Sequence, residues 1–167
     1  MGQLVEEVKL WNTPILGAYY LWRFTQGFIN NHRNGDAPIG LLHFIVTAIL
    51  TNKKLAKPIT NQRADLQSYI RSFEDNHDSD ILLIIQERIK IKLEYTLQAI
   101  DIGVSEGLFV WDMETGKIYS KDITKKPRRG NALKNEYVKE GNKAETLGKW
   151  LSQHDLSTIS NYLKLVL

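Results

Sequence analysis

Hydrophobic residues recur with the period of an α-helix through most of this 167-residue chain. The clearest case lies between Ile81 and Ile100, where they return every three or four positions and predict one long helix over about residues 80–102. The residues of this stripe are Ile81, Ile85, Ile89, Leu93, Leu97 and Ile100. Gly103 follows the stripe and is expected to end the helix.

The period changes to that of a β-strand in one segment. Leu108–Trp111 and Lys117–Lys121 are predicted strands, and the turn between them ends at Gly116. The expected fold class is therefore mainly α with one β-hairpin over about residues 108–121, an α+β fold.

Capping residues mark the other helices. Thr13 is a good N-cap with Pro14 in the first turn, which predicts a helix to about Asn30. Asp155 is the natural N-cap of the last helix. The other predicted helices cover about residues 39–52 after Pro38, 62–73 after Asn61, 135–153 and 156–163.

The chain is long enough for one domain with a proper core, and we predict a single domain over residues 1–167. Its expected parts are a helical core at about 13–103, the hairpin, a basic loop at 124–135 and a C-terminal helical pair at about 135–164.

A winged helix has the order of two helices and then a hairpin, which here would be residues 61–75, 80–102 and 108–121. A winged-helix-like arrangement therefore stays open, and with it a stand-alone DNA-binding regulator. The order by itself is also that of a helical domain with a hairpin packed along one edge.

Gly17 and Gly148 lie inside apolar helical stretches near the two ends of the chain. Glycine in a helix costs about 1 kcal/mol relative to alanine. We expect the close approach of another backbone to offset that cost. This pattern favours a docking subunit over an enzyme.

Asn12-Thr13-Pro14 stands at the start of the first helix, and Ala144-x-x-Leu147-Gly148-x-Trp150 lies near the C-terminus. In these two motifs the chain resembles the middle component of bacterial ABC-ATPase three-component (ABC-3C) systems, the group that includes Lamassu-type anti-phage and anti-plasmid defence complexes. The resemblance implies a non-enzymatic subunit that binds an SMC/Rad50-like ABC ATPase and helps control a separate effector, often a nuclease.

Residues with catalytic spacing are missing from the sequence. There is no cysteine, no phosphate-binding glycine loop and no histidine pair at metal-ligand spacing. His43 lies in an apolar helix and is interpreted as a satisfied core histidine. The acidic run Glu74–Asp80 around His77 is interpreted as a solvated, helix-capping turn. We expect no enzyme activity, no cofactor and no metal site.

Membrane association is not expected, because no apolar run approaches the roughly 20 residues that span a bilayer. The N-terminus has no basic segment before an apolar core, so it does not match a secretory signal. The prediction is a cytoplasmic protein.

A basic segment is the candidate for contact with DNA phosphates through the complex. Its residues are Lys121, Lys125, Lys126, Arg128, Arg129 and Lys134. The segment has no interleaved aromatic residues, so stacking on bases is not expected. The alternatives are a solvated loop or a loop that meets an acidic partner.

Aromatic residues near the first helix are candidates for a protein interface, because Trp and Tyr are favoured at interface hot spots. The candidate anchors are Trp11, Pro14, Tyr19, Tyr20 and Trp22. The apolar residues Leu82, Leu83, Ile84 and Ile91 lie off the stripe of the long helix and also favour burial by more than one neighbour.

Overall fold

The computed structural model describes residues 10–60, 64–122 and 134–167. The helices in these ranges are α2 (Pro14–Asn31), α3 (Gly40–Leu50), α4 (Lys53–Ala56), α5 (Leu66–Asp75), the 3-10 helix η1 (Ser79–Leu83), α6 (Ile84–Ile91), α7 (Leu93–Ser105), α8 (Asn135–Leu151) and α9 (Leu156–Leu163). The strands β1 (Phe109–Trp111) and β2 (Ile118–Ser120) form one antiparallel pair. The predicted fold class, mainly α with one hairpin, is confirmed.

Helix α2 starts where the capping pattern predicts. Thr13 is its N-cap and accepts a hydrogen bond from the Leu16 amide at 3.4 Å, and Pro14 occupies the first helical position. Gly17 faces a side chain rather than a backbone, because a Cβ there would lie 2.9 Å from the Tyr95 ring. The expected backbone neighbour at this glycine is therefore wrong.

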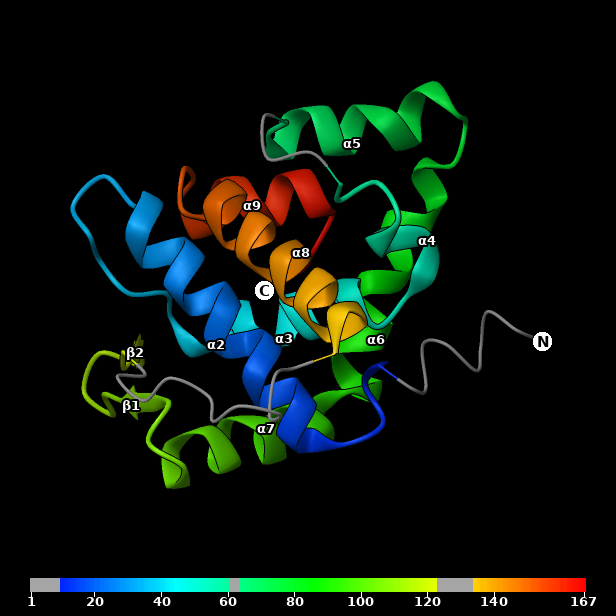
Figure 1. Cartoon of the computed structure of the whole chain (residues 1–167). Coiled ribbons are helices and arrows are strands. Elements are labelled where there is room, and N and C mark those ends of the chain that lie inside the picture. Colours follow the sequence, from blue (N-terminus) through cyan, green and yellow to red (C-terminus); the bar gives the residue numbers. More distant parts are fainter. Residues whose placement is uncertain (1–9, 61–63, 123–133) are drawn as a thin grey trace.

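Helices α2 and α8 lie side by side and run in the same direction (Figure 1). A Cβ on Gly148 would lie 2.8 Å from the Phe28 nitrogen, and a Cβ on Gly27 would lie 2.9 Å from the Glu145 carbonyl carbon. The expected close backbone approach at Gly148 is confirmed. The neighbour is a helix of the same chain, so Gly148 is explained by internal packing rather than by docking.

Helix α3 is the central core element, as its apolar sequence predicts. Nine of its eleven residues are buried, including His43 and Thr47. The Thr47 hydroxyl donates to the His43 carbonyl at 2.9 Å, and the Thr51 hydroxyl donates to the Thr47 carbonyl at 2.6 Å. These local bonds let a nearly apolar helix bury hydroxyl groups at little cost.

The connector after α3 contains the short helix α4, which the sequence reading missed. Asn52 is its N-cap and accepts from the Leu55 amide at 3.1 Å. Helix α5 starts later than predicted, because Asp65 caps it through the Ser68 amide at 2.7 Å. Asn61, the predicted cap, lies outside the described residues.

The predicted long helix over 80–102 is wrong in one respect, since it is broken into η1, α6 and α7. The break falls at Lys92, whose carbonyl accepts both the Thr96 amide at 2.9 Å and the Thr96 hydroxyl at 2.8 Å. A side-chain bond of this kind is typical of a bent helix. The direction of the chain changes sharply between α6 and α7 (Figure 1).

Gly103 does not end the helix as predicted, since α7 continues to Ser105. Gly103 is buried in the helix because the Phe109 ring occupies the space where a Cβ would lie. The positive φ of 77° falls instead on Gly107, in the turn before β1. This glycine lets the chain reverse towards the hairpin.

The hairpin pairs Val110 with Tyr119 and is widened by the loop between α2 and α3. The Ile118 amide donates to the Pro38 carbonyl at 2.9 Å, and the Gly40 amide donates to the Gly116 carbonyl at 2.8 Å. The α2–α3 loop therefore lies beside β2 and extends the edge of the hairpin.

The C-terminal pair agrees closely with prediction. Helix α8 begins at Asn135, and α9 covers Leu156–Leu163 with Asp155 as its N-cap, which accepts from the Thr158 amide at 2.7 Å. The predicted end of α8 at Gln153 is two residues too late.

The elements whose order along the chain suggested a winged helix do not pack together as a winged helix. Helix α5 packs against α8, α9 and η1, while the hairpin packs against α2 and α7. Figure 1 shows α5 at the top of the molecule, and α7 and the hairpin at the bottom. The order of elements along the chain therefore does not translate into a compact helix–helix–wing unit.

Candidate interaction surfaces

Most of the large apolar side chains that the described ranges expose lie between residues 83 and 119. On α7, Leu93, Leu97 and Val104 are 49%, 43% and 41% exposed. Their spacing of four and seven residues places them on one face of the helix. Glu94 and Asp101 are exposed on the same side and border this face. We call Leu93, Leu97 and Val104 the α7 apolar face.

The break at Lys92 creates this face. The helical stripe predicts that Leu93 and Leu97 continue the core line of Ile85, and the structure shows that this is wrong. Because the chain bends, α7 buries a different set towards the core, which consists of Thr96, Ala99, Ile100 and Gly103. The sequence carries no glycine or proline near Lys92 that would signal the change.

Helix α6 adds two exposed apolar side chains, Ile84 and Ile91, which are seven residues apart and share a face. Arg88 lies between them, and its guanidinium donates to the Ala48 carbonyl at 2.9 Å and to the Thr51 hydroxyl at 2.6 Å. Arg88 therefore ties α6 to the C-terminal end of α3. Of the off-stripe residues that the sequence expects to be buried by more than one neighbour, only Leu82 is buried within the described chain, and Leu83, Ile84 and Ile91 are exposed.

The outer face of the hairpin presents Val110 and Tyr119, which are direct cross-strand partners. The other face of the hairpin points towards the core, since its side chains Phe109 and Ile118 are both buried. Phe109 packs on Gly103, so the position of the hairpin is linked to that of α7.

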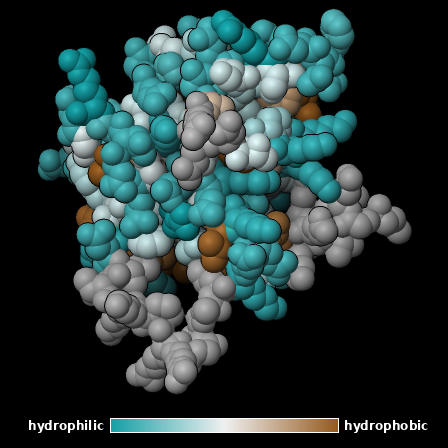
Figure 2. Space-filling model, turned by 45° about the horizontal axis from the view of Figure 1, so that its top comes forward, coloured by the Kyte–Doolittle hydropathy of each residue, from teal (hydrophilic) through white to brown (hydrophobic). Residues whose placement is uncertain are grey.

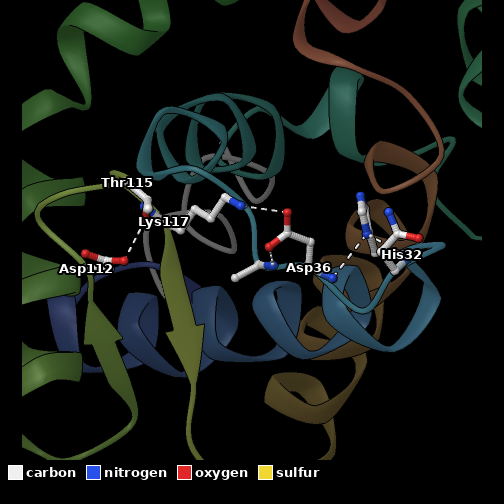
Figure 3. A network of polar contacts seen from close by, with 7 residues as sticks. His32, Asp36, Asp112, Thr115 and Lys117 are labelled. Atoms are coloured by element: carbon white, nitrogen blue, oxygen red, sulfur yellow. Dashed lines mark hydrogen bonds and ion pairs between the residues drawn. The ribbon is translucent and has the colours of Figure 1, made fainter.

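A polar network fixes the hairpin to the α2–α3 loop (Figure 3). Lys117 Nζ donates to Asp36 Oδ2 at 2.6 Å, and the second oxygen of Asp36 accepts from the Ala37 amide at 3.0 Å. The Lys117 ammonium holds the pKa of the Asp36 carboxyl below its usual value. His32 Nδ1 accepts a hydrogen bond from the Asp36 amide at 3.1 Å, and this bond orders the loop between His32 and Asp36.

Asp112 shapes the turn of the hairpin itself. Its carboxylate accepts from the Glu114 amide at 2.9 Å and from the Thr115 hydroxyl at 2.8 Å, and these bonds lower its pKa. Lys117 and His32 also line a cavity of about 180 Å³ together with Asp36, His154 and apolar residues of α2, α3 and α9.

The predicted aromatic anchors are divided between core and surface. Trp11 and Tyr20 are buried in this chain's own core, with ring centroids 4.6 Å apart. Pro14, Tyr19 and Trp22 are half-buried.

Four of these anchors, Trp11, Tyr19, Tyr20 and Trp22, make side-chain hydrogen bonds within the chain. Trp22 Nε1 donates to the Lys121 carbonyl at 2.8 Å, and Trp11 Nε1 donates to Glu140 Oε1 at 3.2 Å. Packing within the chain therefore accounts for much of this aromatic cluster.

The basic segment lies largely outside the described residues, which include only its two ends. Lys121 and Lys134 are both exposed. Lys125, Lys126, Arg128 and Arg129 fall in the range 123–133, of which nothing is described. The contact of this segment with DNA phosphates remains a prediction.

The histidines behave as structural residues where the structure describes them. His43 is fully buried, and its Nε2 lies 2.9 Å from the Thr25 hydroxyl oxygen. Burial lowers its pKa to about 4. His77 has a positive φ of 57° and follows Asn76, the C-cap of α5, and the Asp78 amide donates to the Phe73 carbonyl of that helix at 2.7 Å. The interpretation of the acidic run as a helix-capping turn is confirmed.

Metal ligands are not clustered in residues 10–60, 64–122 and 134–167, where no group of three or more His, Cys, Asp or Glu side chains is placed to hold an ion. No helix in the same ranges is long and apolar enough to cross a membrane.

Comparison with known proteins gives one match, to a family model. No curated protein and no solved structure matches this chain. The family is described as ABC-three component (ABC-3C) system Middle Component 3, and the match covers residues 1–166. The chain belongs to the Middle Component 3 family of ABC-three component systems.

Proposed function

We propose that this chain is a non-enzymatic structural and regulatory subunit of a bacterial defence complex of the Lamassu type, directed against phage or plasmids. In this role it binds the SMC/Rad50-like ABC ATPase of its system in the cytoplasm. It also helps to hold a separate effector, a nuclease, inactive until a nucleic-acid cue arrives.

The α7 apolar face is the observation that supports docking most directly. A middle component has other components to bind, and this face presents apolar side chains on a helix that also packs firmly on the core. Clustered apolar side chains at a surface are typical of protein interaction sites. The bordering Glu94 and Asp101 predict a partner surface that is apolar at its centre and basic at its rim.

The rest of the described surface is consistent with docking through the α7 apolar face. The face of the molecule in Figure 2 is covered mainly by hydrophilic residues, and the hydrophobic ones on it are scattered. Helices α8 and α9 expose no large apolar side chain in the described ranges. Docking is therefore assigned to the α6–α7 side, continued by Val110 and Tyr119 on the hairpin.

The test is co-purification with the ATPase encoded beside this chain. The ATPase is tagged and captured at high salt with wild-type chain or with the double variant Leu93→Ser and Leu97→Ser. We expect the variant to be lost from the complex, because exposed leucines contribute to binding without supporting the fold. The control is Met113→Ser, since Met113 is more exposed and lies in the turn of the hairpin rather than on α6 or α7.

Circular dichroism of each variant shows that it is folded, so loss of capture reports on the interface. Retention of the Leu93 and Leu97 variant at wild-type levels would contradict docking through α7. Control of the effector is tested separately, by measuring nuclease activity of the effector and ATPase with and without this chain. Equal activity in both mixtures would contradict the regulatory role.

A further inference from the structure

An open hollow of about 430 Å³ lies along α8. It is lined by Ile59, Thr60, Lys139, Asn142, Lys143 and Thr146. Lys139 and Lys143 are one helical turn apart and therefore share a face. Among the described residues no carboxylate lines the hollow, so the charge of its described lining is positive.

Two of the three carboxylates of α8 are engaged with other residues than these two lysines. Glu140 is buried and accepts from Trp11, and Glu145 forms an ion pair with Arg23 of α2. Within the described ranges neither Lys139 nor Lys143 has a hydrogen bond or ion pair with another side chain. Helix α8 thus engages Glu140 and Glu145 within the fold, while Lys139 and Lys143 line the hollow.

Asn142 is oriented so that it can donate into this hollow. Arg23 donates to Asn142 Oδ1 at 2.8 Å, and this bond distinguishes the amide oxygen from the amide nitrogen. The Nδ2 group is the remaining end of the side chain and carries two donors. Arg23 also bonds Glu145 and the Tyr19 hydroxyl, so the arginine that orders Asn142 is itself fixed.

Ammonium, amide and hydroxyl donors together are the groups that proteins use to contact phosphate oxygens. The described part of the lining has no aromatic ring on which a base could stack, and Ile59 is its one apolar residue. The chain has a net charge of +3, and Lys134 at the N-cap of α8 is exposed. The occupant that fits this chemistry is a polyanion recognised through its phosphates.

We propose that the α8 hollow binds the sugar–phosphate backbone of nucleic acid without reading its sequence, through Lys139, Lys143 and Asn142. This proposal goes beyond the docking role of α7 and does not depend on it. It also differs from the predicted basic segment, because its residues belong to helix α8, which packs on α2.

The experiment measures binding of the full chain to a fluorescein-labelled DNA duplex by anisotropy over a series of salt concentrations. Lys139→Gln with Lys143→Gln is expected to weaken binding at least tenfold at about 0.1 M salt. The slope of log affinity against log salt should fall by about 2, because each lost phosphate contact contributes about 0.9. A second duplex of unrelated sequence should give the same loss.

The matched control is Lys90→Gln with Lys164→Gln, which removes the same charge from exposed lysines outside the hollow. We expect this pair to change affinity and slope only slightly. Asn142→Asp retains the size of the side chain and the acceptor for Arg23, and adds a negative charge. It should also weaken DNA binding.

Three outcomes would overturn the proposal. In the first, the wild-type chain does not bind DNA. In the second, both pairs of lysine substitutions reduce binding equally, which indicates only general charge attraction. In the third, the Lys139 and Lys143 variant keeps its DNA affinity but loses a protein component, so the hollow is a site for an acidic protein segment. The Leu93 and Leu97 variant separates the two proposals, since it should keep wild-type DNA affinity.

Discussion

Gly148 of α8 lies against the backbone of α2 beside Gly27, and the two helices have no room for a Cβ at either residue. A Cβ on Gly148 would meet the Phe28 nitrogen at 2.8 Å and the Gly27 carbonyl carbon at 3.2 Å. Helices usually pack at axial distances of 8–10 Å, set by the side chains between them. Here the absence of side chains allows α8, which follows more than a hundred residues later, to pack closely on α2.

Replacing Gly148 or Gly27 with alanine should destabilise the chain by about 2–3 kcal/mol, because the added methyl group meets backbone that cannot move aside. Gly141→Ala is the control on the same helix. Its Cβ would lie 3.1 Å from the Tyr19 ring and 3.3 Å from the Arg23 side chain, which are wider contacts and involve side chains rather than backbone. Urea unfolding measures all three. An equal loss for Gly141→Ala would contradict backbone contact as the cause.

Acidification should destabilise the fold through His43. Its pKa is lowered from 6.5 to about 4 by burial, so the folded chain holds the neutral imidazole while the unfolded chain binds a proton below pH 6.5. Stability from this residue is complete above pH 6.5 and falls as pH drops towards 4, by about 3 kcal/mol in total.

His43→Gln tests this, because glutamine can still bond the Thr25 hydroxyl and does not titrate. Unfolding free energies at pH 7 and pH 4.5 should differ less in this variant than in the wild-type chain. The same pH dependence in both would exclude His43 as its source.

Lys117→Met should loosen the hairpin without unfolding the chain. Methionine keeps the aliphatic stem but cannot pair with Asp36, so the contact between β2 and the 36–40 loop weakens. We expect faster hydrogen exchange of the Ile118 and Gly40 amides, which hold this edge together. Global stability should change little, because the ion pair is partly exposed. Lys54→Met is the control. Unchanged hydrogen exchange of the Ile118 amide in Lys117→Met would contradict a role of the Lys117–Asp36 ion pair in holding the hairpin.

Trp11→Phe should lower the stability of the isolated chain by about 1–2 kcal/mol, because it removes the donor to the buried carboxylate of Glu140. A double-mutant cycle with Glu140→Gln measures the coupling between the two side chains. If Trp11→Phe left unfolding unchanged and weakened only the binding of a partner, Trp11 would be an interface anchor as the sequence first suggests.

Local chemistry made several elements predictable from the sequence. Thr13, Pro14 and Asp155 define helix starts because a cap acts within four residues, and the alternation around Phe109 and Ile118 defines the hairpin. The short pattern at Ala144–Trp150 also pointed to the family that the family model matches.

Tertiary structure decided where those elements face. The bend at Lys92 turns Leu93 and Leu97 from expected core positions into an exposed face, and no residue type signals it. Trp11 and Tyr20 are equally aromatic in the sequence, but only packing against α7 and α8 shows that they are buried. Lys139 and Lys143 become an anion site only beside Ile59 and Thr60, because the hollow is made by segments eighty residues apart. Helix caps and hydrophobic periodicity depend on neighbouring residues, whereas burial and surface chemistry depend on which distant segments pack together.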